Sequence, residues 1–95
     1  MVRTKSGHVL HDNKQSTMIT NRLRRAHGQM GAIVRMMEDG RDCEAIVTQM
    51  AAVSKAINAA AFTLISANLK ECLSDPLVDA DDVSARLQKL FLSLA

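Results

Sequence analysis

Residues 43–73 read CEAIVTQMAAVSKAINAAAFTLISANLKECL and contain neither proline nor glycine. The stretch is rich in Ala, Leu, Ile and Met, residue types that favour helices. Asp42 stands directly before it, where a side chain can cap the N-terminus of a helix. The sequence therefore predicts that one long helix, from Cys43 to about Leu73, is the central element of the chain.

A second, shorter helix is predicted upstream of this long one. Apolar residues recur three and four positions apart between Ile19 and Met37, which is the spacing of one helix face. Ser16 or Thr17 can cap its start. Gly40 stands where a residue with positive φ would end the helix.

A third helix and an N-terminal arm complete the predicted organisation. Pro76 ends the long helix, and Asp79 can start a short helix near the C-terminus. Residues 1–15 show little apolar periodicity and are predicted to form a flexible arm. We expect residues 16–95 to form a single all-α domain of three helices.

Composition and charge point to an aliphatic helical core and a polyanionic partner. The 95 residues are 47% hydrophobic but only 2% aromatic, and this composition favours packed helices over a sheet. Because so short a chain buries a limited fraction of its surface, we expect it to oligomerise. Residues 1–37 carry a net charge of +6 and residues 38–95 a net charge of −4. This segregation fits a basic surface that faces DNA, and a solvated basic face is the alternative.

Membrane and secretory signals are not evident in the sequence. No uninterrupted apolar run reaches the roughly 18 residues of a bilayer span, and residues 1–5 lead into polar sequence. We expect a cytoplasmic protein without a membrane partner. In a reducing compartment, two cysteines are expected to form a metal site or a reactive thiol pair rather than a structural disulfide.

The two cysteines, Cys43 and Cys72, stand at opposite ends of the predicted long helix. A rise of about 1.5 Å per residue separates them by roughly 43 Å, so they cannot meet within one chain. If two copies of the helix pair antiparallel and cross near residues 57–58, Cys43 of one chain lies beside Cys72 of the other. Twofold symmetry then gives two equivalent sites in each dimer.

Asn68 lies one helical turn before Cys72 and shares its face. A His at this position would complete a soft-metal site for Cu(I), but an amide is a poor ligand for a soft ion. Two thiols without a third strong ligand fit thiol chemistry better. In such chemistry one thiolate attacks an oxidised or polysulfide sulfur, and the second thiol resolves the product. Cys43 is assigned the attacking role because the dipole at its helix N-terminus favours the thiolate.

Two other uses of the cysteines compete with this hypothesis. Both side chains can simply be small buried hydrophobes, as free cysteines often are. An enzymatic role is the least favoured, because the sequence offers no catalytic base near Cys43 and no CxxC motif. We expect neither an enzymatic activity nor a bound cofactor.

Four short runs resemble the CsoR/RcnR family of bacterial repressors. These runs are NRLRRAHGQ at 21–29, DGRDC at 39–43, QMAAV at 49–53 and NLKEC at 68–72. The resemblance spans roughly residues 18–92. It implies a three-helix protomer, a dimer with paired second helices and usually a tetramer. It also implies binding to operator DNA until an effector is sensed.

The residues at the ligand positions most resemble the persulfide-sensing branch, the CsoR-like sulfurtransferase repressors. Copper sensors of the family carry His at the position of Asn68, and nickel or cobalt sensors carry His at the positions of both Asn68 and Cys72. Formaldehyde sensors generally lack a Cys at position 72. The resemblance therefore implies that reactive sulfur species cross-link Cys43 to Cys72 of the partner chain and lower DNA affinity. The alternative is a metal-sensing repressor that binds Cu(I), or that holds Zn or Ni with His11, Cys43 and Cys72.

Basic residues of the first helix form the predicted DNA surface. Arg22, Arg24 and Arg25 lie close together, and no acidic residue occurs between Asp12 and Glu38. Since no helix-turn-helix pattern is present, we expect readout through the DNA backbone and DNA shape. The predicted contact residues are Arg22 and Gln29, which the resemblance implies, and Lys14, Arg25 and Lys55, which charge suggests.

Overall fold

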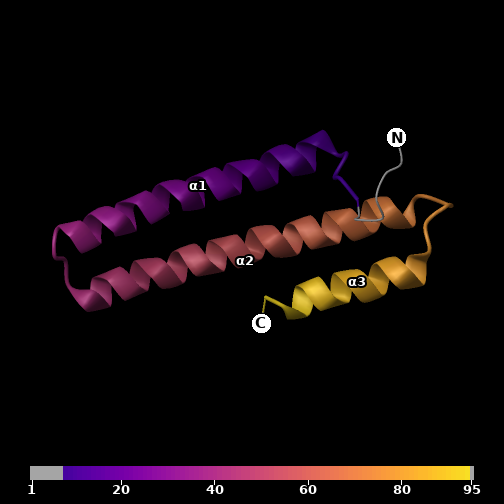
Figure 1. Ribbon diagram of the computed structural model, residues 1–95. Coiled ribbons are helices and arrows are strands. Elements are labelled where there is room, and N and C mark those ends of the chain that lie inside the picture. The colour runs from indigo at the N-terminus through magenta and orange to yellow at the C-terminus, as the bar shows by residue number, and fades with distance from the viewer. Residues whose placement is uncertain (1–7, 95) are drawn as a thin grey trace, which may run out of the picture.

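The computed structural model describes residues 8–94, which form three helices and no strand (Figure 1). The helices are α1, Asn13–Glu38; α2, Cys43–Leu73; and α3, Ala80–Leu92. The all-α fold and the three predicted helices are thus confirmed. Residues 1–7 of the predicted arm lie outside the described residues.

Helix α1 begins four or five residues earlier than the predicted caps, Ser16 or Thr17, allow. Its N-cap is Asp12, whose carboxylate accepts hydrogen bonds from the backbone N–H groups of Lys14 and Gln15. Ser16 and Thr17 therefore lie inside the helix. The apolar pattern did not reveal this first turn, because its residues are polar. Asp is among the strongest N-cap residues, and Asp12 therefore starts the helix before the apolar pattern begins.

A Schellman motif ends α1 at the predicted glycine. Gly40 has a φ of 68°, and its N–H donates to the carbonyl of Met37 at 3.2 Å. The N–H of Arg41 donates to the carbonyl of Met36 at 3.0 Å. These two bonds satisfy carbonyls that the helix end would otherwise leave unpaired, and they turn the chain toward α2.

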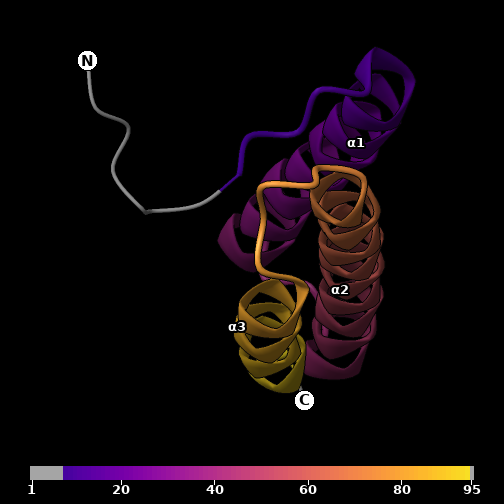
Figure 2. The ribbon, with the colours of Figure 1, turned by 90° about the vertical axis from the view of Figure 1, so that its right-hand side faces the viewer.

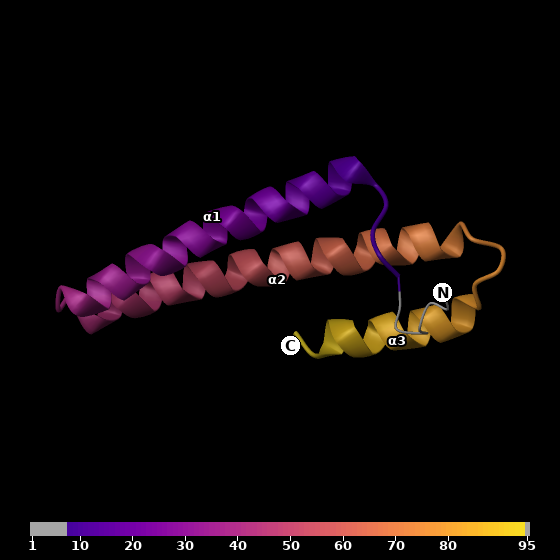
Figure 3. The same cartoon turned by 45° about the horizontal axis from the view of Figure 1, so that its top comes forward.

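Helix α2 is the central element, with α1 packed along one side and α3 along another (Figure 2). Its N-cap is Asp42, which accepts from the N–H of Ala45 at 3.0 Å, as the sequence predicts. Helices α1 and α2 are antiparallel and diverge from their connecting loop toward the N-terminal end of α1 (Figure 3). One small core joins them, formed by Ala26 and Ile33 of α1 with Ile46 and Val53 of α2.

A second small core lies at the other end of α2, where Cys72 packs against Val83 and Leu87 of α3. Elsewhere on its surface, α2 leaves large apolar side chains exposed, including Met50 at 53% and Phe62 at 51%. By length and composition alone, α2 is apolar enough to cross a membrane, which the sequence pattern did not lead us to expect. A single helix of this kind is weak evidence for a membrane span, because the core helix of a soluble protein can have the same length and apolar composition.

Candidate functional site

Cys72 is buried where the C-terminal end of α2 meets α3. Its side chain is only 6% exposed and contacts Val83 and Leu87. Its Sγ donates a hydrogen bond to Oδ1 of Asn68 at 3.4 Å. Asn68 therefore lies on the same helix face as the thiol, one turn away, and offers it an amide oxygen.

Cys43 is the first residue of α2 and is exposed. The unbroken helix from Cys43 to Leu73 holds the two thiols at opposite ends of one element. A single chain therefore presents an accessible thiol at one end of α2 and a shielded thiol at the other.

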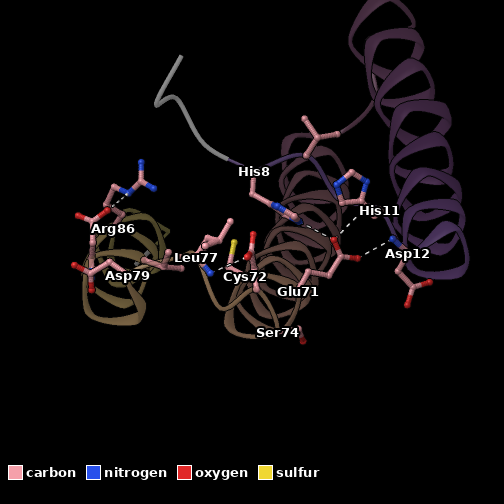
Figure 4. A pocket seen from close by; sticks show the side chains of 14 residues that line it. His8, His11, Asp12, Glu71, Cys72, Ser74, Leu77, Asp79 and Arg86 are labelled. Carbon is pink, nitrogen blue, oxygen red and sulfur yellow. Dashed lines mark hydrogen bonds and ion pairs between the residues drawn. The ribbon is translucent and has the colours of Figure 1, made fainter. Parts of the chain in front are cut away.

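Glu71 binds the segment that precedes α1 (Figure 4). Its Oε1 accepts from Nε2 of His8 at 2.7 Å and from the backbone N–H of His11 at 2.8 Å. Its Oε2 accepts from the backbone N–H of Asp12 at 2.7 Å. These bonds, that of His11 foremost and those of His8 and Asp12 after it, lower the pKa of the Glu71 carboxyl from 4.5 to about 2.

Sequence reasoning missed Glu71. Glu71 belongs to the run at 68–72 that resembles the repressor family, but that run assigned it no role, and its partners lie about sixty residues earlier in the chain. Two of the three donors are backbone N–H groups, which every residue except proline possesses. Only its position directly before Cys72 sets it apart in the sequence.

An open cleft of about 1090 Å³ lies between residues 8–12, the end of α2 and the start of α3. The cleft is lined by His8, His11, Glu71 and Cys72, among others (Figure 4). The imidazole rings of the two histidines lie edge to face, with their centroids 5.2 Å apart. The structure therefore brings His11 to the cleft of Cys72, and Cys43 lies at the other end of α2. Within residues 8–94, no three His, Cys, Asp or Glu side chains gather as a metal site.

The predicted DNA-contact residues divide into two groups. Lys14, Arg22 and Arg25 line one shallow depression on α1, and all three are exposed. Nη1 of Arg22 also donates to Oγ1 of Thr63 at 3.3 Å, which ties α1 to α2. Gln29 and Lys55 are exposed but lie outside this depression.

This helical chain matches the model of a family of transcriptional repressors. Residues 15–92 match the family model described as "Metal-sensitive transcriptional repressor". The chain belongs to this family of metal-sensitive transcriptional repressors. The family resemblance drawn from the sequence is thus confirmed, and the persulfide-sensing branch stays a prediction.

Individual relatives include copper sensors. The chain is 34% identical to the copper-sensing transcriptional repressor CsoR of Bacillus subtilis, covering 77% of this chain and 72% of that protein. It is 34% identical to the copper-sensing transcriptional repressor RicR of Mycobacterium tuberculosis, covering 64% of each chain. It is 31% identical to the copper-sensing repressor CsoR of Mycobacterium ulcerans, covering 76% of this chain and 60% of that protein. No solved structure gave a significant match.

Proposed function

We propose that this repressor binds operator DNA in its reduced form and is released when per- or polysulfide chemistry cross-links Cys43 to Cys72 of a partner chain. The observation that carries the proposal is the contact between Cys72 and Asn68, whose amide oxygen accepts from the thiol at 3.4 Å. An amide in this place leaves two thiols without a third strong soft ligand, which favours sulfur exchange over Cu(I) binding.

The chemistry needs one accessible thiol and one thiol that resolves the product. The exposed Cys43 thiolate attacks the outer sulfur of a low-molecular-weight persulfide, forms a Cys43 persulfide and releases the carrier thiol. The partner's buried thiol at position 72 then attacks the Cys43 sulfur, a disulfide forms, and sulfide leaves with the proton. Both cysteines are oxidised, and the transferred sulfur is reduced to sulfide.

The partner that the site requires is a second copy of the chain. The exposed apolar side chains of α2, Met50, Ile57 and Leu64 among them, supply a surface that a second α2 can cover. Antiparallel pairing places each Cys43 near the partner's second thiol, and tetramers form by further burial of apolar surface. Lys55, in the middle of α2, would be costly inside a bilayer, so a protein partner in the cytoplasm fits this helix better than lipid.

DNA binding is assigned to the basic depression on α1. Lys14, Arg22 and Arg25 present their charges on one exposed surface, as phosphate contacts require. Gln29 and Lys55, outside the depression, extend this surface in the assembled oligomer. Cross-linking two α2 helices would change the spacing of these surfaces, because each α1 packs on its own α2.

A metal-sensing repressor is the second candidate function, because three relatives are described as copper-sensing repressors. In this alternative, Cys43 and the partner's second thiol bind Cu(I), or bind Zn or Ni together with His11. His11 lines the same cleft as Cys72, which supports this alternative.

One experiment separates the two candidates. Operator duplexes are first selected from a random pool with the reduced protein, and binding is then measured before and after addition of polysulfide or Cu(I). Intact mass is recorded in parallel for wild type, Cys43→Ala and Cys72→Ala. Release of DNA together with covalently linked dimers in wild type alone supports the sulfur mechanism. Release by stoichiometric Cu(I) without a covalent change would replace it with the metal mechanism.

A further inference from the structure

The segment of residues 8–12, here called the strap, bridges two elements that diverge. It joins the start of α1 to the C-terminal end of α2, and Glu71 is the acceptor that holds it there. One carboxylate takes three donors from the strap, all between 2.7 and 2.8 Å, so both oxygens are used. Charge-assisted bonds of this kind are stronger than neutral ones, and a carboxylate also suits the N-terminal end of a helix.

The strap forms one wall of the cleft that Cys72 lines. His8, Val9 and His11 contribute to that wall, and Val83 of α3 lines the same cleft. Cys72 is 6% exposed in this arrangement. Val83 and Leu87 of α3 bury Cys72 from one side. The strap lines the same cleft as Cys72 and therefore borders an approach to the thiol from that cleft.

We propose that Glu71 is a latch that keeps the strap over Cys72 and couples this thiol to the DNA-binding end of α1. The identity of the effector in this proposal rests on the proposed function, whereas the shielding of Cys72 by the strap does not. When the latch opens, Cys72 becomes accessible to Cys43 of the partner. The first turn of α1 also loses an anchor, because Asp12 is both a latch donor and the N-cap of that helix. Glu71 is in this sense a positioning residue.

The latch is tested by the alkylation of Cys72. In a Cys43→Ala background only Cys72 reacts with iodoacetamide, and the rate is measured from neutral to high pH. We expect Glu71→Gln to raise the high-pH plateau of the rate by at least about tenfold, as expected for the loss of charge-assisted hydrogen bonds. Asp81→Asn, which removes a carboxylate from the exposed first turn of α3, is the charge control and should leave the plateau unchanged.

The plateau distinguishes shielding from a simple charge effect. Removing a negative charge next to a thiol lowers the pH midpoint of the reaction and cannot raise the rate of the full thiolate, because thiolate nucleophilicity falls with the thiol pKa. A midpoint shift with an unchanged plateau therefore overturns the latch.

A second pair of variants leaves the Glu71 charge in place. His11→Pro removes the backbone N–H that donates to Oε1, whereas His11→Ala keeps it, and both lose the imidazole. A higher plateau for His11→Pro than for His11→Ala supports the latch, and equal plateaus overturn it. This pair decides the question if Glu71→Gln fails to fold by circular dichroism.

The proposed function can fail separately. If polysulfide does not release wild-type protein from operator DNA but Glu71→Gln still raises the plateau, the sulfur mechanism is wrong and the latch stands. If polysulfide releases the protein and no variant changes the plateau, the latch is wrong and the sulfur mechanism stands.

Discussion

At the scale of single residues, two polar side chains of α2, Asn68 and Glu71, lie close to Cys72. Asn68 accepts the thiol hydrogen bond, and Glu71 holds the strap that lines the same cleft. Neither side chain is a soft metal ligand, and the two side chains contact different partners. Asn68 faces the sulfur directly, whereas Glu71 reaches the segment before α1.

Asn68→His should convert the thiol pair into a stronger Cu(I) site. An imidazole one turn before Cys72 adds a third strong ligand to two thiolates, so Cu(I) affinity should rise by at least about tenfold. The affinity is measured by competition with a Cu(I) chelator of known affinity. Asn68→Ala, which adds no ligand, is the matched control. A similar Cu(I) affinity for both variants would contradict the assignment of position 68 to the site.

The Glu71 carboxyl makes stability depend on acidic pH. Its pKa is about 2 in the folded chain against an ordinary 4.5, so its ionised form stabilises the fold. That contribution is fully present above about pH 4.5 and is lost as the pH falls toward 2. The free energy of unfolding in urea should therefore differ between wild type and Glu71→Gln near neutral pH, and the difference should shrink on acidification. A difference that stays constant from pH 7 to pH 3 would contradict this role of the carboxylate.

At the scale of the elements, the ends of the helices define the chain path. Asp12, Asp42 and Asp79 cap the three N-termini, and each accepts backbone N–H groups of its first turn. Gly40 supplies the positive φ that folds α1 back along α2. These local signals define where the helices of the hairpin begin and where the chain turns between them.

Gly40→Ala should destabilise the chain by about 1 kcal/mol, because a Cβ disfavours the φ of 68° that the Schellman motif requires. A Cβ added at Gly40 would meet no atom within 4 Å beyond its chain neighbours, so the effect is conformational rather than a clash. Gly28→Ala in the interior of α1 is the matched control, with equally open surroundings. It should stabilise by up to about 1 kcal/mol, since Ala is the better helix former. Thermal unfolding of both variants checks the opposite signs.

At the scale of the whole molecule, the fold is elongated, and the other two helices cover only part of the surface of α2. Its principal extents are 55 × 25 × 23 Å, and α2 contacts both other helices while α1 and α3 do not contact each other within residues 8–94. A chain built in this way buries few apolar side chains internally. Association with further copies would supply the missing burial.

Cross-linking between different variants tests the antiparallel arrangement. Cys43→Ala retains Cys72, and Cys72→Ala retains Cys43, so a mixed dimer contains one complete pair. After the two variants are unfolded together, refolded and treated with polysulfide, we expect covalently linked heterodimers on non-reducing gels. Each variant alone should stay unlinked, because antiparallel pairing keeps like thiols at opposite ends of the dimer. Efficient linking of either variant alone would contradict this arrangement.

The amino-acid sequence by itself determined the elements of this protein and the separation of its thiols. Asp42 and Gly40, together with the stretch free of proline and glycine, specify where helices begin and end, because capping and φ preferences act over a few residues. An unbroken helix between Cys43 and Cys72 then fixes their separation by its rise.

Only the tertiary structure decided which side chains are covered and what Glu71 does. Leu23 and Met30 share the apolar pattern of α1 with Ile19 and Ile33, yet they stay 44% and 48% exposed. Periodicity marks a face, but the crossing of α1 and α2 selects the part of that face that is buried. The contacts of Glu71 likewise depend on the path of the strap across the end of α2, and backbone donors leave no trace in the side-chain pattern.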